Sequence, residues 1–471
     1  MSTTTAPATA IRSGAVGGNG LLTILLTGQF MAILDVSIVN VAAPTIRTDL
    51  SASGARLQLI VAGYTIAYAV LLITGARLGA RHGHRTVFLT GLAAFTVASL
   101  ACGLAQTSGQ LIAFRFGQGV GAALMVPQVL SLIQRSFHGA ARARALSLYA
   151  AAIAGGAVIG QISGGVLVAA DLFGTGWRPV FLVNVPVGLL LLLLGGRVMP
   201  RDAGDRSRSL DLPGLALLVP TVLAFIVPLV LGHEQGWPLW GWLCLFASGV
   251  LLVFFVAVQR TVSRAPLIPG RILRIRSVVA GVVVLFGSFA IYGGWLFCLA
   301  VYVQSGLGWS PLRTGLLFLP GAVGFATASL TWRRLPEGWH RGLIPVGLAV
   351  ATVSMALLAL VASLGDPPSA LLSLVFAVNG LGMGFAFSPV MSVALAEVPP
   401  ADAPNASGLL TTTLQLAQAV GVAVFGTLYL SLLSTRTVSA AATTTALALA
   451  AVEATTATLA LLLLRPRPAA P

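Results

Sequence analysis

Asp35 is the residue of this chain whose position says most about chemistry, because it lies well inside an apolar stretch, in the segment LDVSIVNVAAP (residues 34–44). An ionised aspartate deep in a membrane helix costs roughly 3 kcal/mol and normally faces a partner or a water-filled cavity. Burial also favours the neutral acid. We therefore expect Asp35 to bind and release a proton or to hold a cationic substrate. A structural carboxylate bonded to a neighbouring helix is the alternative.

Arg115 is the matching cation, in the segment FRFGQGVGAA (residues 114–123) of another apolar stretch. A guanidinium there is permanently charged and needs a carboxylate, carbonyl groups or water. Asp35 is the expected partner. A nearby cation favours the charged carboxylate, so a conformational change that parts the two would release or recruit a proton. A fixed ion pair that joins two helices is an equal alternative.

The elements that must position these residues are transmembrane helices. Hydrophobic residues make up 57% of the chain and charged residues 8%, and the mean hydropathy is +0.95. A soluble domain carries about 25% charged residues, so the composition excludes one. A span needs about 20 apolar residues, and this rule predicts fourteen spans near 21–44, 57–79, 86–104, 109–134, 143–169, 180–198, 212–232, 238–259, 278–303, 312–332, 342–363, 370–396, 405–433 and 444–464.

The cationic residues set the expected orientation. All 27 are arginines, the net charge is +15, and most of them fall on alternate connections between the spans. A cytoplasmic excess of such residues fixes orientation during insertion. We therefore expect a protein of the inner (cytoplasmic) membrane with both termini in the cytoplasm. Because the arginines are scattered over short loops, anionic lipid headgroups are the expected counter-charge and nucleic acid is not an expected partner.

A weak internal repeat predicts a six-plus-two-plus-six plan. The fourth span reads QGVGAALMVP from Gln118, and the twelfth reads NGLGMGFAFSP from Asn379. Parallel repeats with a binding site between them are a transporter plan. The expected divisions are a cytoplasmic tail (1–20), a six-helix bundle (21–199), a linker with two extra spans (200–277), a second six-helix bundle (278–465) and a second tail (466–471).

The remaining reactive residues indicate no enzyme. Cys102, Cys244 and Cys298 each lie alone in an apolar segment, so neither a disulfide framework nor a metal site is predicted. No catalytic constellation of side chains is visible, and a chain without lysine has no phosphate-binding Gly-Lys-Ser/Thr loop. Glu453 is the one further carboxyl that could be membrane-embedded; a solvated position close to the outer surface is the alternative. Glu234 is expected in an outer loop.

Five motifs, in order, resemble those of the fourteen-span drug:proton antiporters of the major facilitator superfamily. LDVSIVNVAAP is similar to the first-span motif, ARLGARHGHRTVFL to the loop signature after span 2, RFGQGVGAA to the fourth-span motif, GGAVIGQISGG to the antiporter motif of span 5, and WRPVFLVNVPVG to the entry of span 6. The resemblance covers nearly the whole chain. It implies an all-α membrane protein with the major facilitator fold: two six-helix bundles with two extra helices inserted between them.

The resemblance assigns roles to residues. Asp35 and Arg115 would couple transport to protons, and the expected conformational residues are Arg81, Gly83, Arg85, Gly156, Gly160, Gly164 and Gly165. The substrate cavity would lie between the halves, and its candidate lining residues are Gln29, Tyr64, Tyr68, Gln128, Gln161, Phe289, Tyr292, Asn379 and Gln415. Three positions depart from the family pattern: Ala80 replaces an aspartate, Gln161 a proline and Leu414 an arginine.

The implied function is export of a small amphipathic compound (a drug, an antibiotic or a metabolite) in exchange for protons, by alternating access. The resemblance implies no cofactor, since the proton gradient supplies the energy, and a monomer in contact with membrane lipids. Two alternatives stay open. The first is a proton symporter or facilitative importer of the same fold, which the glutamine in place of the family's proline at position 161 leaves possible. The second is a membrane-embedded enzyme or sensor.

Overall fold

The computed structural model describes residues 15–206, 210–232, 234–261, 266–267, 270–365, 367–399 and 402–463, and within them it contains helices and no strand. Fourteen helices are long and apolar enough to cross a membrane, which confirms the predicted spans. In chain order the helices are α1 (Ala15–Asp49), α2 (Gly54–His82), α3 (His84–Gly103), α4 (Ser108–Ser136), α5 (Gly139–Ala170), α6 (Pro179–Leu182), α7 (Asn184–Val198), α8 (Leu212–Leu231), α9 (Leu239–Thr261), α10 (Arg276–Val301), α11 (Pro311–Thr331), α12 (His340–Ala362), α13 (Ser369–Ala396), α14 (Ala403–Leu433) and α15 (Val438–Leu463).

Some boundaries differ from the predicted ones. The sixth span is interrupted at Val183, between α6 and α7. Pro186 explains this break, because it has no N–H to donate to the carbonyl of Leu182. The first helix begins at Ala15, inside the segment expected to be a tail. The predicted tails otherwise lie outside the described residues (1–14 and 464–471), as do Arg12, Arg208, Arg264, Arg465 and Arg467 of the charge pattern.

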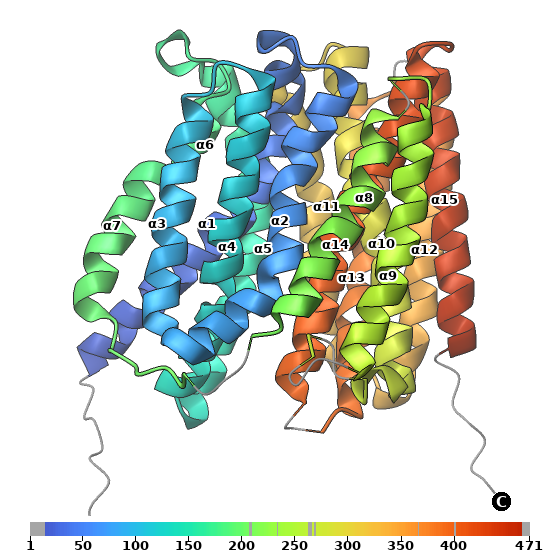
Figure 1. Cartoon of the computed structure of the whole chain (residues 1–471). Coiled ribbons are helices and arrows are strands. Elements are labelled where there is room, and N and C mark those ends of the chain that lie inside the picture. The colour runs from blue at the N-terminus through green and yellow to red at the C-terminus, as the bar shows by residue number, and fades with distance from the viewer. Residues whose placement is uncertain are drawn as a thin grey trace, which may run out of the picture.

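The helices form two bundles side by side (Figure 1). Helices α1 to α7 pack mainly on one another, and so do α10 to α15. Helix α8 lies against α2 of the first bundle and α14 of the second, while α9 packs mainly on α8 and leaves most of its surface exposed. The ends of the described chain, Ala15 and Leu463, lie at the same end of the bundles, which we call the termini face; the other end is the far face.

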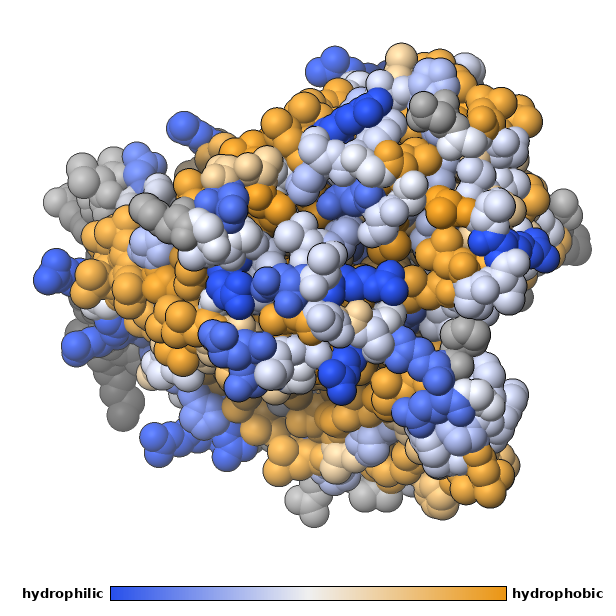
Figure 2. Space-filling view, turned by 90° about the horizontal axis from the view of Figure 1, so that it is seen from above, coloured by the Kyte–Doolittle hydropathy of each residue, from blue (hydrophilic) through white to orange (hydrophobic). Residues whose placement is uncertain are grey.

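The two bundles touch through α2 with α14 and α5 with α11, and the contacts described next lie toward the far face. Gln304 Nε2, just beyond α10, donates to Val41 O of α1 at 2.9 Å, and Thr427 Oγ1 of α14 donates to Gln58 Oε1 of α2 at 3.2 Å. A Cβ added to Gly165 of α5 would lie 2.7 Å from the carbonyl oxygen of Pro311. The bundles are therefore joined at the far face in this conformation. Figure 2, which looks onto that face, shows polar and charged residues gathered there beside apolar flanks.

The glycines of α5 bring it against α1. A Cβ added to Gly156, Gly160 or Gly164 would lie 2.8–3.0 Å from a main-chain oxygen of α1. Small residues on one face let helices approach closely in lipid, where packing drives helix association. These glycines consequently set the distance between α5 and the helix that carries Asp35.

Candidate functional site

The structure brings Asp35 and Arg115 together in the interior of the first bundle. Arg115 Nη1 donates to Asp35 Oδ2 at 2.5 Å, and the side chains are 1% and 0% exposed. Such a pair is favourable only when the remaining donors and acceptors are also satisfied. Neighbouring residues provide hydrogen-bond partners for both carboxylate oxygens and for Nε and Nη1 of the guanidinium.

Two amides complete the coordination of the carboxylate. Gln118 Nε2 and Asn184 Nδ2 donate to Asp35 Oδ1 at 3.0 and 2.9 Å. Gln118 lies one helical turn after Arg115 and also accepts from its Nη1 at 2.9 Å. Ser99 Oγ of α3 in turn accepts from Gln118 Nε2 at 2.8 Å. The cluster therefore ties α1, α3, α4 and α7 together through hydrogen bonds between buried groups.

Arg115 also reaches α2. Its Nε donates to Ile60 O at 3.0 Å, and its guanidinium lies over the ring of Tyr64, 4.8 Å from the centroid. Tyr64 itself donates to Ala32 O of α1 at 3.2 Å. A cation over an aromatic face contributes about 2 kcal/mol when both are desolvated. Because α2 also contacts α14 of the second bundle, the ion pair is linked to the interface between the halves.

The surroundings of Asp35 make one of its two expected roles, the binding of a cationic substrate, unfavourable. Both carboxylate oxygens accept hydrogen bonds from protein groups, and the cluster lies among helices of one bundle. A cationic substrate would have to displace these donors to reach the carboxylate. Asn40, five residues further along α1, does not take part in this cluster through its amide N–H group: its Nδ2 donates to Val36 O of its own helix at 3.1 Å.

The junction between α2 and α3 contains three of the expected conformational residues, Arg81, Gly83 and Arg85. Gly83 has φ +94°, which a residue with a Cβ adopts only under strain, and Asp202 packs against it. The Asp202 carboxylate accepts from the main-chain N–H groups of His84 and Arg85 at 2.7 and 3.0 Å, which caps α3. The segment after α7 thus brings the carboxylate of Asp202 to the junction of α2 and α3. Ala80, which replaces the family's aspartate, lies in the last turn of α2 beside this junction.

Arg81 and Arg85 of this signature contact α7 and the segment that follows it. Arg85 Nη2 donates to Gly196 O of α7 at 2.7 Å. The main chain of Gly204 packs against that of Arg81. The loop signature and the connection after α7 therefore form one unit on the termini face.

Three of the candidate lining residues in the first bundle are used in packing. Tyr64 and Tyr68 are buried with ring centroids 5.9 Å apart. Gln128 donates to Gly75 O of α2 at 2.8 Å, and its Oε1 bonds to the His84 ring at 2.8 Å. Gln128 therefore joins α2, α3 and α4 and has little capacity left for a substrate.

The amides of Gln29 and Gln161, unlike that of Gln128, are not fully used in hydrogen bonds within the protein. Both are buried, and the Oε1 atom of each has no hydrogen-bond partner in the described structure. An unsatisfied buried oxygen costs about 1–3 kcal/mol. Gln161 lies where α5 meets α11, since a Cβ on Gly315 of α11 would lie 2.6 Å from its main-chain oxygen. These two amides are the predicted residues with free acceptors for a ligand.

In the second bundle, Phe289 and Tyr292 of α10 belong to an aromatic cluster. Phe289 lies 5.8 Å from Tyr292 and 5.3 Å from Phe387 of α13, and Phe387 lies 5.6 Å from Phe325 of α11, between ring centroids. The cluster joins three helices expected to line the cavity. Phe325 and Phe387 escaped the sequence analysis because an aromatic residue in an apolar span carries no local sign of its neighbours.

The last two predicted lining residues are on α13 and α14. Asn379 Nδ2 donates to Ser354 Oγ of α12 at 2.8 Å, so its amide binds a neighbouring helix. Gln415 is half-buried on α14. Sequence reasoning also gave no role to Asn184 or Ser99: Asn184 was noted only as part of the motif at the entry of span 6, and Ser99 is a single polar group in an apolar span.

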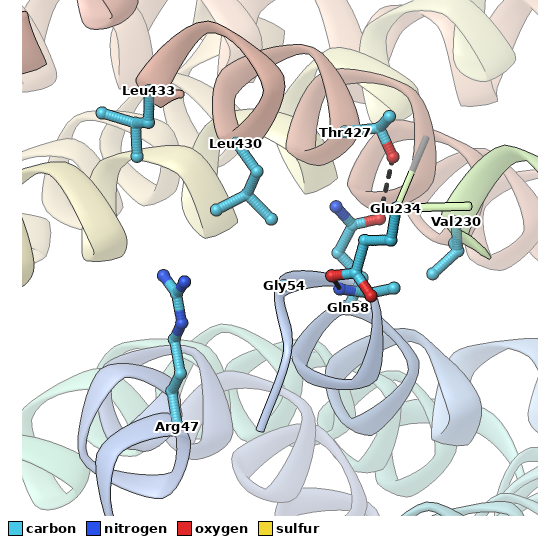
Figure 3. Close-up of a pocket in the computed structure, with 9 residues that line it drawn as sticks. Arg47, Gly54, Gln58, Val230, Glu234, Thr427, Leu430 and Leu433 are labelled. Carbon is cyan, nitrogen blue, oxygen red and sulfur yellow. Dashed lines mark hydrogen bonds between the residues drawn. The ribbon is translucent and has the colours of Figure 1, made fainter. Parts of the chain in front are cut away.

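A cavity of about 330 Å³ lies near the far face between α2 and α14 (Figure 3). Its polar lining residues include Arg47, Gln58, Glu234 and Thr427. Glu234, expected in an outer loop, lies between α8 and α9, and its Oε1 accepts from the N–H of Ala55 at 2.8 Å. The extra helices thus contribute a carboxylate to the contact between the bundles.

Comparison with known proteins agrees with this architecture. The family model described as Major Facilitator Superfamily matches residues 25–422. The chain is 39% identical over 427 residues to the "Probable actinorhodin transporter" of Streptomyces coelicolor, covering 89% of this chain and 74% of that one. It is 36% identical over 419 residues to the cephamycin export protein CmcT of Amycolatopsis lactamdurans, covering 86% and 83%.

Solved structures share the fold at low identity. A bacterial homologue of the human lysosomal transporter Spinster superposes with a TM-score of 0.65 at 18% identity, covering 94% of this chain and 96% of that one. The peptide transporter POT in complex with sulfate gives a TM-score of 0.69 at 15% identity, covering 94% of each chain. With its fourteen spans and the family match over most of its length, this chain belongs to the major facilitator superfamily and is a membrane transporter.

Proposed function

We propose that this transporter exports a small amphipathic organic compound, of the class that includes antibiotics, in exchange for protons. The names of the relatives support the substrate class, since they include a cephamycin export protein and a puromycin resistance protein. The buried pair of Asp35 and Arg115 carries the proposal for proton coupling. In this proposal the termini face is cytoplasmic, and the protein lies in the inner membrane.

The geometry supplies a coupling route. Protonation of Asp35 removes the charge that holds Arg115, and the guanidinium is also bonded to Ile60 O and stacked on Tyr64. Both are on α2, which contacts α14 across the interface. A proton on Asp35 therefore acts on the helix that must move when the halves rock. In this proposal the two halves give access to each side in turn, and the contacts at the far face break when that side opens.

The proposed residues for substrate recognition follow from the same arrangement. The free amide oxygens of Gln29 and Gln161 accept hydrogen bonds, and the aromatic cluster around Phe289 supplies apolar surface. A pocket with much apolar surface and a few oriented polar groups binds amphipathic compounds.

The test is substrate-driven proton movement in proteoliposomes, with a panel of antibiotics and lipophilic cations. We expect at least one compound to drive counterflow of protons, and Asp35→Asn to abolish it. Asp49→Asn is the matched control: Asp49 is on the same helix but is 45% exposed, in a surface pair with Arg178. A wild-type protein that moves a compound with protons in the same direction, or with none, would contradict antiport.

A further inference from the structure

Glu453 is the only charged residue of α15 (Val438–Leu463) and lies far from both ends of that helix. At 1.5 Å per residue it is about 22 Å from the start and about 15 Å from the end. Its side chain is 1% exposed. Of the two positions left open by the sequence, the structure therefore shows the embedded one, because the surrounding helices cover the side chain.

Neither carboxyl oxygen of Glu453 has a hydrogen-bond partner in the described structure. The hydroxyl of Ser288 on α10 lies close to this carboxyl, and it is also buried and forms no hydrogen bond of ordinary geometry. Two unsatisfied groups thus face each other between α10 and α15. Buried unpaired polar groups are rare and call for an explanation such as a ligand or a proton.

The neighbouring helices bring no counter-charge to Glu453. Helix α14 contains no charged residue; the arginine of α10 is its first residue, Arg276, and α12 has its basic residues at its start. The other ionisable groups of these helices are Cys298, Tyr292 and Tyr429, which are neutral acids. An ionised carboxylate without a partner costs several kcal/mol in such surroundings. These surroundings therefore favour the neutral acid over the carboxylate.

A small cavity lies on the far-face side of Glu453. Its volume is about 20 Å³, which is room for one water molecule. It is lined by Leu449, one helical turn from Glu453 on the same face of α15, and by Tyr429 of α14, whose buried hydroxyl has no hydrogen-bond partner. The cavity and the Tyr429 hydroxyl thus lie on the side of Glu453 that faces the far face.

The helix that covers Glu453 also closes the far face. Helix α10 continues into a π-helical segment, Tyr302–Gly306, which contains Gln304, the residue bonded to Val41 O of α1. Short π-helical segments occur frequently at functional sites. Opening of the far face breaks the bond of Gln304 and moves the same helix that holds Ser288 against Glu453.

We propose that Glu453, with Ser288 as its hydrogen-bonding partner, is a second proton-binding site, separate from Asp35 and located inside the second bundle. Its carboxylate takes a proton from water at the far face when that face is open and holds it as the neutral acid when the face closes. The proton then leaves toward the termini face before the far face opens again, which restores the carboxylate. This inference rests on the proposed proton antiport. It adds a proton that each transport cycle carries through the second bundle.

The first test is spectroscopic and does not need a substrate. A neutral buried carboxyl has an infrared carbonyl band that a carboxylate lacks. We expect the purified protein at neutral pH to show this band, Glu453→Gln to lose it and Asp35→Asn to keep it. Glutamine has nearly the shape of the neutral acid, so the fold should persist. A band that is unchanged in Glu453→Gln would mean that Glu453 is ionised, which would overturn the proposal.

The second test counts protons per substrate in proteoliposomes. We expect one proton fewer in Glu453→Gln, with substrate affinity within about twofold of wild type. Glu397→Gln is the matched control, because this exposed carboxylate at the end of α13 accepts from Ser277 Oγ at 3.0 Å and should leave the count unchanged. If wild type moves protons and Glu453→Gln moves as many, only this inference fails. If wild type moves none, the proposed antiport itself fails.

Discussion

Removing the charges of Asp35 and Arg115 singly and together separates a coupling role from a structural one. Each single variant, Asp35→Asn or Arg115→Gln, leaves its partner charged and almost fully buried. Breaking a buried pair in this way costs about 3–5 kcal/mol. The asparagine also turns an N–H group toward either Arg115 or the donors Gln118 and Asn184. We expect both single variants to be strongly destabilised.

The double variant removes the uncompensated charge. Its cost should be smaller than the sum of the two single costs by about 3 kcal/mol, because no ion is left unpaired inside the bundle. The assay is thermal or denaturant unfolding of the four proteins in the same detergent. Substrate-driven proton movement in proteoliposomes is then measured for the wild type and for the double variant.

The two measurements give opposite expectations for the double variant. Its stability should recover largely, whereas its coupled proton movement should stay abolished, because the proton acceptor is gone. A double variant that recovers proton-coupled transport along with stability would show that the pair only joins α1 to α4. Additive losses of stability would show that the two charges do not act as a pair.

Three further predictions concern residues outside this pair. Gly160→Ala should lower the free energy of unfolding by about 1–3 kcal/mol, since its Cβ would lie 2.8 Å from a carbonyl oxygen of α1. In the Gly155→Ala control the added Cβ would lie 3.8 Å from its nearest neighbour, so this variant should unfold at nearly the wild-type temperature. Asp202→Ala should cost about 1–2 kcal/mol through loss of the α3 cap; wild-type thermal stability in this variant would contradict the assignment. Gln29→Met and Gln161→Met should each raise stability by about 1 kcal/mol by removing an unsatisfied oxygen, while weakening substrate binding; binding that is unaffected would exclude these amides from the substrate site.

The sequence by itself determined the membrane class, the fourteen spans and the residue types of the central pair. Hydropathy is a sum over neighbouring residues, so a stretch of about 20 apolar residues reveals a span without knowledge of its partners. The same reasoning located Asp35 and Arg115, because a charge inside such a stretch is conspicuous in a single segment. Family motifs then placed these segments in a fold.

Only the tertiary structure decided what those side chains touch. Asn184 is 149 positions from Asp35, and its bond to that carboxylate depends on how α7 crosses α1. Asn379 was expected to face the substrate, yet its amide binds α12, since an amide carries no mark of the direction it takes around a helix. The sequence left the surroundings of Glu453 open for the same reason. Its depth can be counted along the chain, but its burial depends on α10 and α12, which pack against α15 from other parts of the sequence.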